Sequence, residues 1–244
     1  MVIPFELDIL ERGHEYQKWV IDSVKPFLGK RILEAGAGIG NMSRWLPAGE
    51  RLIITETETQ LVPVLEDTIR KSFGNSKAVS VRQLDLASDW ASALASENPD
   101  TIVSFNVMEH IVDDARALSD FARLLRSSHA QGPRRIITFA PAHGWAFGSM
   151  DRAYGHSRRY TLGGFRKLAA ASAPGFSFEG RYFNLFGLPG WLLMSFVLRK
   201  QALGLASVLA FENACPRIRH IDDFLHQKLH IPFGQSILTV LTLK

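Results

Sequence analysis

A glycine-rich turn that directly follows a short apolar run is the feature that most constrains this fold. Residues 31–41 read Arg-Ile-Leu-Glu-Ala-Gly-Ala-Gly-Ile-Gly-Asn, and the apolar positions Met42, Trp45 and Leu46 predict a helix after the turn. A strand–turn–helix unit brings backbone N–H groups close to a nucleotide in α/β folds. The glycine spacing here is G-x-G-x-G, which departs from the G-x-G-x-x-G of dinucleotide-binding turns.

Along the rest of the chain, short apolar runs alternate with amphipathic stretches. This pattern predicts an α/β fold, Rossmann-like, with a mostly parallel sheet and helices on both faces. We expect seven strands, at Arg31–Ala35, Arg51–Thr55, Ala78–Gln83, Thr101–Phe105, Arg135–Ala140, Phe176–Tyr182 and Gln235–Leu243. We expect helices at Glu6–Leu28, Gln60–Phe73, Trp90–Ser96, Val112–Leu125 and, capped by Thr161, up to Ala171.

Length and composition fit one folded unit. The chain has 244 residues, 46% of them hydrophobic and 21% charged, which is an ordinary globular composition with room for a full core. We therefore expect a single domain over 1–244, with a helical lid at 1–29, a substrate loop at 141–160 and a helical insertion at 188–228. The apolar stretch at 185–198 is shorter than the ~20 residues that a membrane span needs.

Charge and cysteine content bound the partners and the compartment. The formal net charge is +4 and the calculated pI is 9.3, but aromatic residues do not interleave with a basic stripe, so we expect no nucleic-acid partner. The single Cys215 excludes an intramolecular disulfide, and the first residues lack the pattern of a secretory signal. We expect a cytoplasmic protein, and the oligomeric state stays open.

Each of the first three expected strands ends in a carboxylate, at the edge where open α/β sheets bind ligands. Glu34 is suited to pair with a ligand ammonium. Glu56 lies 18 residues after the second glycine of the turn and could accept from both hydroxyls of a ribose. Asp85 could accept from an adenine amino group, with the Leu86 N–H serving a ring nitrogen. Alternatively Glu56 is a solvated acid, Glu58 replaces it, or Asp85 caps a helix.

The turn and these acids resemble motif I and its neighbours in class I S-adenosylmethionine-dependent methyltransferases. The stretch 105–111, Phe-Asn-Val-Met-Glu-His-Ile, resembles the N-V-x-E-H segment after the fourth strand of many small-molecule members. The resemblance implies a last antiparallel strand, and a Glu109–His110 pair that opens the next helix. The expected cofactor-binding residues are Glu34, Gly36, Ala37, Gly38, Gly40, Glu56, Thr57, Asp85, Leu86, Asn106, Val107, Tyr16 and Trp19.

The segment 141–160 follows the fifth expected strand and is rich in aromatic and polar residues, as suits a small, flat acceptor. Its end, Gly155-His-Ser-Arg-Arg-Tyr160, resembles a bacterial methyltransferase subgroup with a G-H-x-R-R-Y signature. That subgroup also has the Tyr16 and Trp19 pair, which could close over the cofactor, although Trp19 could equally anchor the core. The expected substrate-binding residues are Trp145, Asp151, Tyr160, Tyr182 and Asn184.

Histidines in this region are candidates for a general base, because their unperturbed pKa lies near neutrality. The candidates are His156, His110 and His143. His156 could equally be structural, and His110 could merely cap or pack. Arg158 and Arg159 more plausibly form an ion-pair network with Asp151 that closes the loop.

The leading hypothesis is a methyltransferase that uses S-adenosylmethionine, releases S-adenosylhomocysteine and methylates nitrogen or oxygen of a small, flat or heteroaromatic acceptor in secondary metabolism. A second hypothesis is an acceptor on a lipid-linked sugar or quinone precursor, with the helix after 188 docked on a membrane. A non-catalytic cofactor-binding protein and, if the glycine spacing misleads, an NAD-type oxidoreductase are further alternatives. We expect no metal, because His220, His226 and His230 lack supporting cysteines or paired carboxylates.

Overall fold

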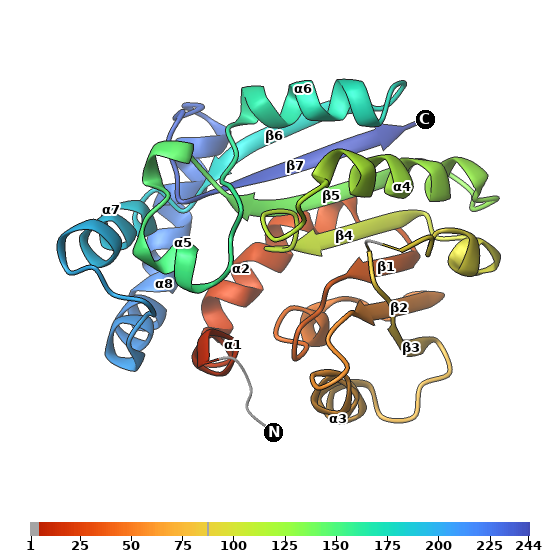
Figure 1. Cartoon of the computed structure of the whole chain (residues 1–244), viewed down its shortest axis with the longest axis horizontal. Helices are drawn as coiled ribbons and strands as arrows, with labels where there is room; N and C mark the ends of the chain where they lie inside the picture. The colour runs from red at the N-terminus through yellow and green to blue at the C-terminus, as the bar shows by residue number, and fades with distance from the viewer. Residues whose placement is uncertain (1–4, 87) are drawn as a thin grey trace.

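The computed structural model describes residues 5–86 and 88–244, which are built around one seven-stranded sheet (Figure 1). The strands are β1 (Arg31–Ala35), β2 (Arg51–Glu56), β3 (Val79–Gln83), β4 (Thr101–Phe105), β5 (Arg134–Pro141), β6 (Ser177–Phe183) and β7 (Ser236–Leu243). Their order is β3-β2-β1-β4-β5-β7-β6, and β7 runs antiparallel to both β5 and β6. The predicted fold class, strand number and last antiparallel strand are confirmed.

The central strands are apolar on both faces because helices cover both faces. All five residues of β4 are buried, and alternate residues of β4 belong to different cores. Ile102 belongs to the core beneath α4 (Asp114–Ser127) and α6 (Leu162–Ser172). Val103 belongs to the opposite core, beneath α2 (His14–Val24) and α3 (Val62–Phe73). The period-two alternation therefore explains why the middle of these strands is apolar apart from Thr and Ser, whereas the charged residues of β1, β2 and β5 lie at or next to the strand ends.

The N-terminal helix is divided, which corrects the prediction of one helix over 6–28. The structure has α1 (Phe5–Leu10), then α2, then a 3-10 turn at Lys25–Phe27. Gly13 ends the first helix, and its N–H donates to Leu10 O at 3.0 Å. The chain therefore changes direction between α1 and α2, so α1 can approach the glycine-rich turn.

The helix predicted after the glycine turn is also wrong. Only a 3-10 turn, Ser43–Trp45, follows, and Leu46 is extended with φ −71° and ψ 143°. Pro47 explains the end, because a proline disfavours helical backbone at the residue before it and cannot donate a hydrogen bond. A second predicted helix, over 90–96, is a 3-10 helix at Ser92–Glu97.

Helical segments gather at the end to which the arrowheads of β4 and β5 point (Figure 1). They are α5 (Ser149–Ala153), α7 (Gly187–Leu192), a π-helical turn at Leu193–Val197 and α8 (Leu205–Gln227), with a 3-10 turn at Gly144–Ala146. The mostly helical character expected for 188–228 is confirmed. No helix among the described residues is long and apolar enough to cross a membrane.

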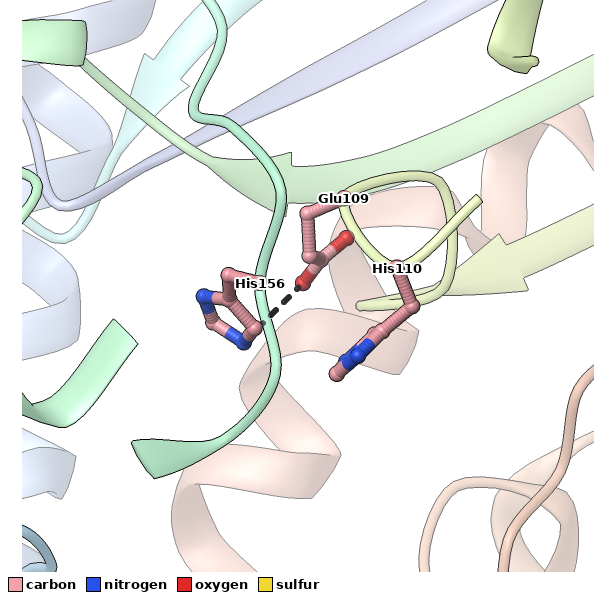
Figure 2. A group of neighbouring side chains, drawn as sticks. All are labelled: Glu109, His110 and His156. Carbon is pink, nitrogen blue, oxygen red and sulfur yellow. Dashed lines mark ion pairs between the residues drawn. The ribbon is translucent and has the colours of Figure 1, made fainter. Parts of the chain in front are cut away.

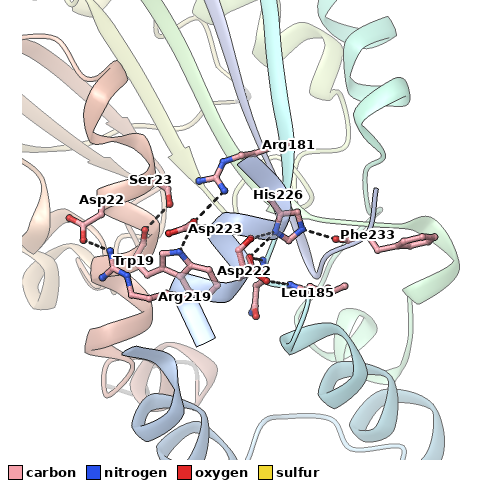
Figure 3. A network of polar contacts seen from close by, with 11 residues as sticks. Trp19, Asp22, Ser23, Arg181, Leu185, Arg219, Asp222, Asp223, His226 and Phe233 are labelled. Atoms are coloured by element: carbon pink, nitrogen blue, oxygen red, sulfur yellow. Dashed lines mark hydrogen bonds and ion pairs between the residues drawn. The ribbon is translucent and has the colours of Figure 1, made fainter. Parts of the chain in front are cut away.

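A buried network ties α8 to the rest of the fold (Figure 3). Asp222 accepts from the backbone N–H groups of Asn184 and Leu185 at 3.0 and 2.6 Å. His226 Nδ1 lies 2.9 Å from Asp222 Oδ2, and its Nε2 lies 2.8 Å from Phe233 O. Burial alone would lower the pKa of His226, but the hydrogen bond to Asp222 opposes this effect and the pKa is raised. The long helix is therefore fixed to the corner that follows β6.

Candidate functional site

The glycine-rich turn leaves β1 at the carboxyl edge of the sheet and requires glycine at its first position. Gly36 has φ +73°, and a Cβ there would lie 2.7 Å from the Val107 Cγ2 atom. Gly38 and Gly40 also have positive φ, at 59° and 88°. The turn therefore packs its bare backbone against the loop after β4, so two predicted cofactor segments, around Gly36 and Val107, are in direct contact.

Glu34 and Glu56 end adjacent strands beneath this turn, and their surroundings differ. Glu56 accepts from Gly38 N–H at 2.6 Å and from the N–H groups of Thr57 and Glu58 at 2.9 Å. Glu34 is 1% exposed, and its Oε2 has no hydrogen-bond partner among the described residues. Burial, reinforced by the charge of Glu56, raises the pKa of Glu34 to about 7. A proton or a cation would neutralise this buried carboxyl, which also has a hydrogen bond to Ser43.

The N-terminal segment lies against the turn. Leu7 side-chain carbons would be 3.4 Å from a Cβ at Gly38, and Leu7 O accepts from Asn41 Nδ2 at 2.9 Å. Trp45 Nε1 donates to Gln17 Oε1 at 2.8 Å, which joins the loop after the glycines to α2. These contacts put α1 against the glycine-rich turn.

Tyr16 and Trp19 lie deeper than α1. Trp19 is fully buried, its ring centroid lies 4.2 Å from that of Phe183, and its Nε1 donates to Asp223 Oδ1 at 3.2 Å (Figure 3). Tyr16 meets the same Phe183 ring edge-on at 6.3 Å. The structure therefore gives Trp19 the contacts of a core anchor, which was the alternative to a lid.

The remaining predicted cofactor residues surround the turn. Leu84 N–H donates to Glu56 O at 2.9 Å, so Asp85 and Leu86 follow at the tip of β3, beside the tip of β2. Asn106 is exposed, has φ +53°, and donates its N–H to Phe139 O at 2.8 Å. The strand tips of β1 to β4 therefore meet at one edge, as the sequence predicts.

Asp151 is the centre of a buried polar network in the loop after β5. Its Oδ1 lies 2.7 Å from Arg159 Nε and 2.8 Å from His156 Nδ1, and its Oδ2 accepts from Gly148 N–H at 2.8 Å. Against the opposing effect of burial, these partners hold the pKa of Asp151 below its usual range. The predicted ion pair between Arg159 and Asp151 is confirmed, whereas Arg158, predicted to join the same network, pairs with Asp114 instead.

Tyr160 connects this loop to the loop after β4. Its hydroxyl lies 3.0 Å from Met108 O and 2.8 Å from Asp114 Oδ2, and Arg158 Nη1 lies 2.8 Å from the same carboxylate oxygen. Ser157 N–H donates to Glu109 O at 2.7 Å. The hydroxyl of Tyr160, proposed for the substrate, is thus engaged in holding two loops together.

Glu109 lies between His110 and His156, and sequence reasoning did not anticipate this group (Figure 2). Their ligand-type atoms all lie within 4.8 Å of one another, and His156 Nε2 is 3.9 Å from Glu109 Oε1. Burial raises the pKa of Glu109 to about 8. The expectation that Glu109–His110 opens the next helix is wrong, because α4 begins at Asp114 with Asp113 as its N-cap. No local signal joins Glu109 to His156, since 47 residues separate them.

His143 is stacked between aromatic rings beside this group. Its ring lies 4.7 Å from Tyr182, at 8° between planes, and 5.1 Å from Trp145. It is 4% exposed, and its Nε2 has no hydrogen-bond partner among the described residues. Burial and the charge of Arg159 lower the pKa of His143. The Nε2 atom without a hydrogen-bond partner is the position at which this imidazole could accept a proton.

Asn184, expected to bind substrate, has both ends of its amide engaged. Its Oδ1 accepts from Gly187 N–H at 2.8 Å, and its Nδ2 donates to Gln235 Oε1 at 2.9 Å. The residue is 2% exposed and has φ +60°. These contacts fix the start of α7.

The comparisons with known proteins agree with this geometry. Residues 11–130, just under half of the chain, match the model of a methyltransferase domain family. No sequence among the curated proteins matches the chain.

Solved structures resemble it over most of its length. An S-adenosylmethionine-dependent methyltransferase from Mesorhizobium loti is 12% identical, covers 92% of this chain and 97% of its own, and has a TM-score of 0.57. The magnesium protoporphyrin IX methyltransferase of Synechocystis, with bound S-adenosylhomocysteine, is 16% identical over 73% of this chain and 80% of its own, with a TM-score of 0.51. The (4+2)-cyclase SpnF is also 16% identical, over 94% and 79%, with a TM-score of 0.51. The chain therefore has the fold of the class I S-adenosylmethionine-dependent methyltransferases and matches a methyltransferase domain over residues 11–130.

Proposed function

We propose that this protein transfers a methyl group from S-adenosylmethionine to a nitrogen or oxygen of a small, flat or heteroaromatic metabolite, as in secondary-metabolite biosynthesis. The observation that carries the proposal is Glu34. It is a buried carboxylate with an unpartnered oxygen, and it lies beneath a glycine turn on a methyltransferase fold. An ammonium group, such as that of the cofactor's methionine half, would satisfy it.

The edge of the sheet offers a partner for each part of the cofactor. Glu34 would pair with the ammonium, and Glu56 would exchange its bond to Gly38 N–H for the two ribose hydroxyls. Asp85 and the Leu86 N–H would bind adenine. Val107 would border the methionine half. Leu7, which already contacts the turn, supports the proposal that the segment 1–29 covers the bound cofactor.

The acceptor would lie against the loop 141–160. Trp145 is 56% exposed and stacks on His143, so a flat molecule can extend the stack of rings. The unpartnered Nε2 of His143 is the candidate base. The cofactor supplies a methyl group that its positive sulfonium already activates, so the main task of the chain is alignment, which can contribute ~7–11 kcal/mol. We also propose that this chain belongs to the bacterial methyltransferase subgroup with the G-H-x-R-R-Y signature.

Calorimetric titration with S-adenosylhomocysteine, with NADH as the control ligand, is the test. We expect micromolar binding of S-adenosylhomocysteine by the wild type and at least ~tenfold weaker binding by Glu56→Ala, because two charge-assisted hydrogen bonds are lost. Glu58→Ala is the matched control, since Glu58 is exposed and next but one in sequence. Preference for NADH, or no binding, would overturn the proposal.

Binding alone does not establish methyl transfer, because the (4+2)-cyclase SpnF shares this fold. A screen of acceptors with methyl-labelled S-adenosylmethionine separates an enzyme from a non-catalytic cofactor-binding protein. Label found in an acceptor supports the proposed reaction. Tight binding without label in any acceptor favours the non-catalytic alternative.

An exposed apolar group favours a second candidate, a lipid-linked acceptor. Leu193, Phe196, Val197 and Leu198 are 45–70% exposed, and Arg199 and Lys200 follow directly. Apolar side chains beside basic residues are suited to the surface of an anionic membrane. Co-sedimentation with vesicles of anionic lipid tests this. If the wild type stays in the supernatant at low salt, the lipid-linked acceptor is excluded.

A further inference from the structure

The cluster formed by Glu109, His110 and His156 lies outside the cofactor contacts described above. Glu109 is 0% exposed, and neither carboxylate oxygen has a hydrogen-bond partner among the described residues. A buried carboxylate without partners is costly unless a cation or a proton neutralises it. The charge of Arg159 acts on Glu109, but this guanidinium is already bound to Asp151 and to Ala142 O. Glu109 therefore lacks a partner of its own.

The two histidines present ring nitrogens to the same space. Asp151, a carboxylate, can only accept, so Nδ1 of His156, which lies 2.8 Å from Asp151 Oδ1, carries a proton. The other ring nitrogen of His156, Nε2, faces Glu109 and lies 3.9 Å from its Oε1 atom. The ring of His110 meets that of His156 edge-on, with centroids 4.8 Å apart. Figure 2 shows the Glu109 carboxylate between the two imidazoles.

We propose that Glu109, His110 and His156 bind a divalent transition-metal ion, such as Zn²⁺ or Mn²⁺. The donor set of two imidazoles and one carboxylate is one that such ions prefer. Asp151 behind His156 forms the carboxylate–histidine–metal arrangement that fixes the tautomer and orientation of a ligand. Ligands ~2.1 Å from a metal lie ~3.4 Å apart in a tetrahedron, so the present spread of up to 4.8 Å requires only side-chain adjustments.

The three ligands leave at least one coordination position open. His110 is exposed and His156 is partly exposed, so the open position faces the outside of the site and not the core. A metal with three protein ligands and an open position is a catalytic type of site. We infer that an acceptor would bind through an oxygen atom, a hydroxyl or a phenol. This last step rests on the proposed function, whereas metal binding itself does not. It also revises the sequence-based expectation that the protein needs no metal.

The test is titration of the full chain, without a histidine tag, with Co²⁺ followed by visible absorption and with Zn²⁺ by calorimetry. We expect one equivalent of metal per chain. Glu109→Gln and His110→Ala are expected to weaken binding at least ~tenfold. The matched control is His220→Ala, since His220 is an exposed histidine of α8 and should leave binding unchanged. Thermal unfolding checks that each variant is folded, and because His110 is exposed, its variant should fold even if that of Glu109 does not.

The outcomes separate this inference from the proposed function. One equivalent of metal that is lost in the cluster variants supports the metal site, whether or not S-adenosylhomocysteine binds. Binding of S-adenosylhomocysteine without stoichiometric metal overturns the metal site alone. Equal metal binding by the wild type and both cluster variants also overturns it, because the metal then binds elsewhere.

Discussion

Two buried carboxylates after neighbouring strands, Glu34 and Glu109, have oxygens without hydrogen-bond partners among the described residues, and their surroundings differ. Glu34 lies beneath a glycine turn and beside another acid, Glu56. Glu109 lies between two imidazoles. The first environment offers carboxylate oxygens beside the glycine-rich turn, which suits an organic ammonium. The second offers two nitrogen ligands, which suits a metal ion. Different cations can thus neutralise a buried carboxylate, and the groups that surround the carboxylate indicate which cation binds.

The two regions also differ in how they are built. The turn is formed by residues close in sequence, 34–40. The region around Glu109 depends on the network of Asp151, whose partners His156 and Arg159 lie on the same loop, and on Tyr160, which bonds to Asp114. We therefore expect the second region to be more sensitive to loss of a single buried charge.

The largest expected effect is that of Asp151→Ala. This change leaves Arg159 buried without its partner, and removing one member of a buried ion pair costs about 3–5 kcal/mol. Urea unfolding measures the loss. Asp67→Ala is the control, because that exposed acid pairs with Arg70 and Lys71 at the surface and its removal should have no measurable effect. A loss below about 1 kcal/mol for Asp151→Ala would mean that the network does not hold the loop.

A reciprocal pair of variants tests the comparison of the two carboxylates directly. Glu34→Gln should weaken binding of S-adenosylhomocysteine ~10–100-fold, because a charge-assisted pair is lost, and should leave Co²⁺ binding unchanged. Glu109→Gln should do the reverse. Calorimetry with each ligand on each variant gives four affinities. If either variant weakens both ligands equally, the two carboxylates do not serve separate cations.

How much of this the sequence predicts depends on the distance between partners. The seven strands follow from apolar, β-branched runs, and the turn with its acids follows from residues within one βαβ unit. Pro47 could also have predicted that no long helix follows the glycine turn, since only a 3-10 turn at Ser43–Trp45 precedes it. The structural roles of Tyr160 and Asn184 could not, since Asp114 and Gln235 lie 46 and 51 residues away. The grouping of Glu109 with His156 likewise appears only when β4 and β5 are paired.

Two glycines with nearly equal φ angles, Gly36 and Gly155, provide a matched test. Gly36 has φ +73° and Gly155 has φ +74°, but a Cβ would meet Val107 only at Gly36. Each change to alanine should destabilise the fold by about 1–2 kcal/mol, the cost of a left-handed backbone, and the clash with Val107 adds to this cost at Gly36. Only Gly36→Ala should also weaken binding of S-adenosylhomocysteine, because it displaces the loop after β4. Equal effects of both variants on binding would show that the contact between Gly36 and Val107 does not shape the site.

The last expected effect is a pH dependence that originates at Glu34. Because burial raises the pKa of this carboxyl to about 7, it is protonated below that pH and must lose the proton to pair with an ammonium. Affinity for S-adenosylhomocysteine should therefore rise with pH, by about 15-fold in total between pH 5.5 and 7, and level off above. The same linkage predicts proton release on binding, which calorimetry in buffers of different ionisation enthalpy measures. Glu34→Gln has no proton to release, so its weaker binding should be independent of pH over this range. If the affinity of Glu34→Gln for S-adenosylhomocysteine still depends on pH, another group titrates in this range. Glu34 would then not be the partner of the ammonium.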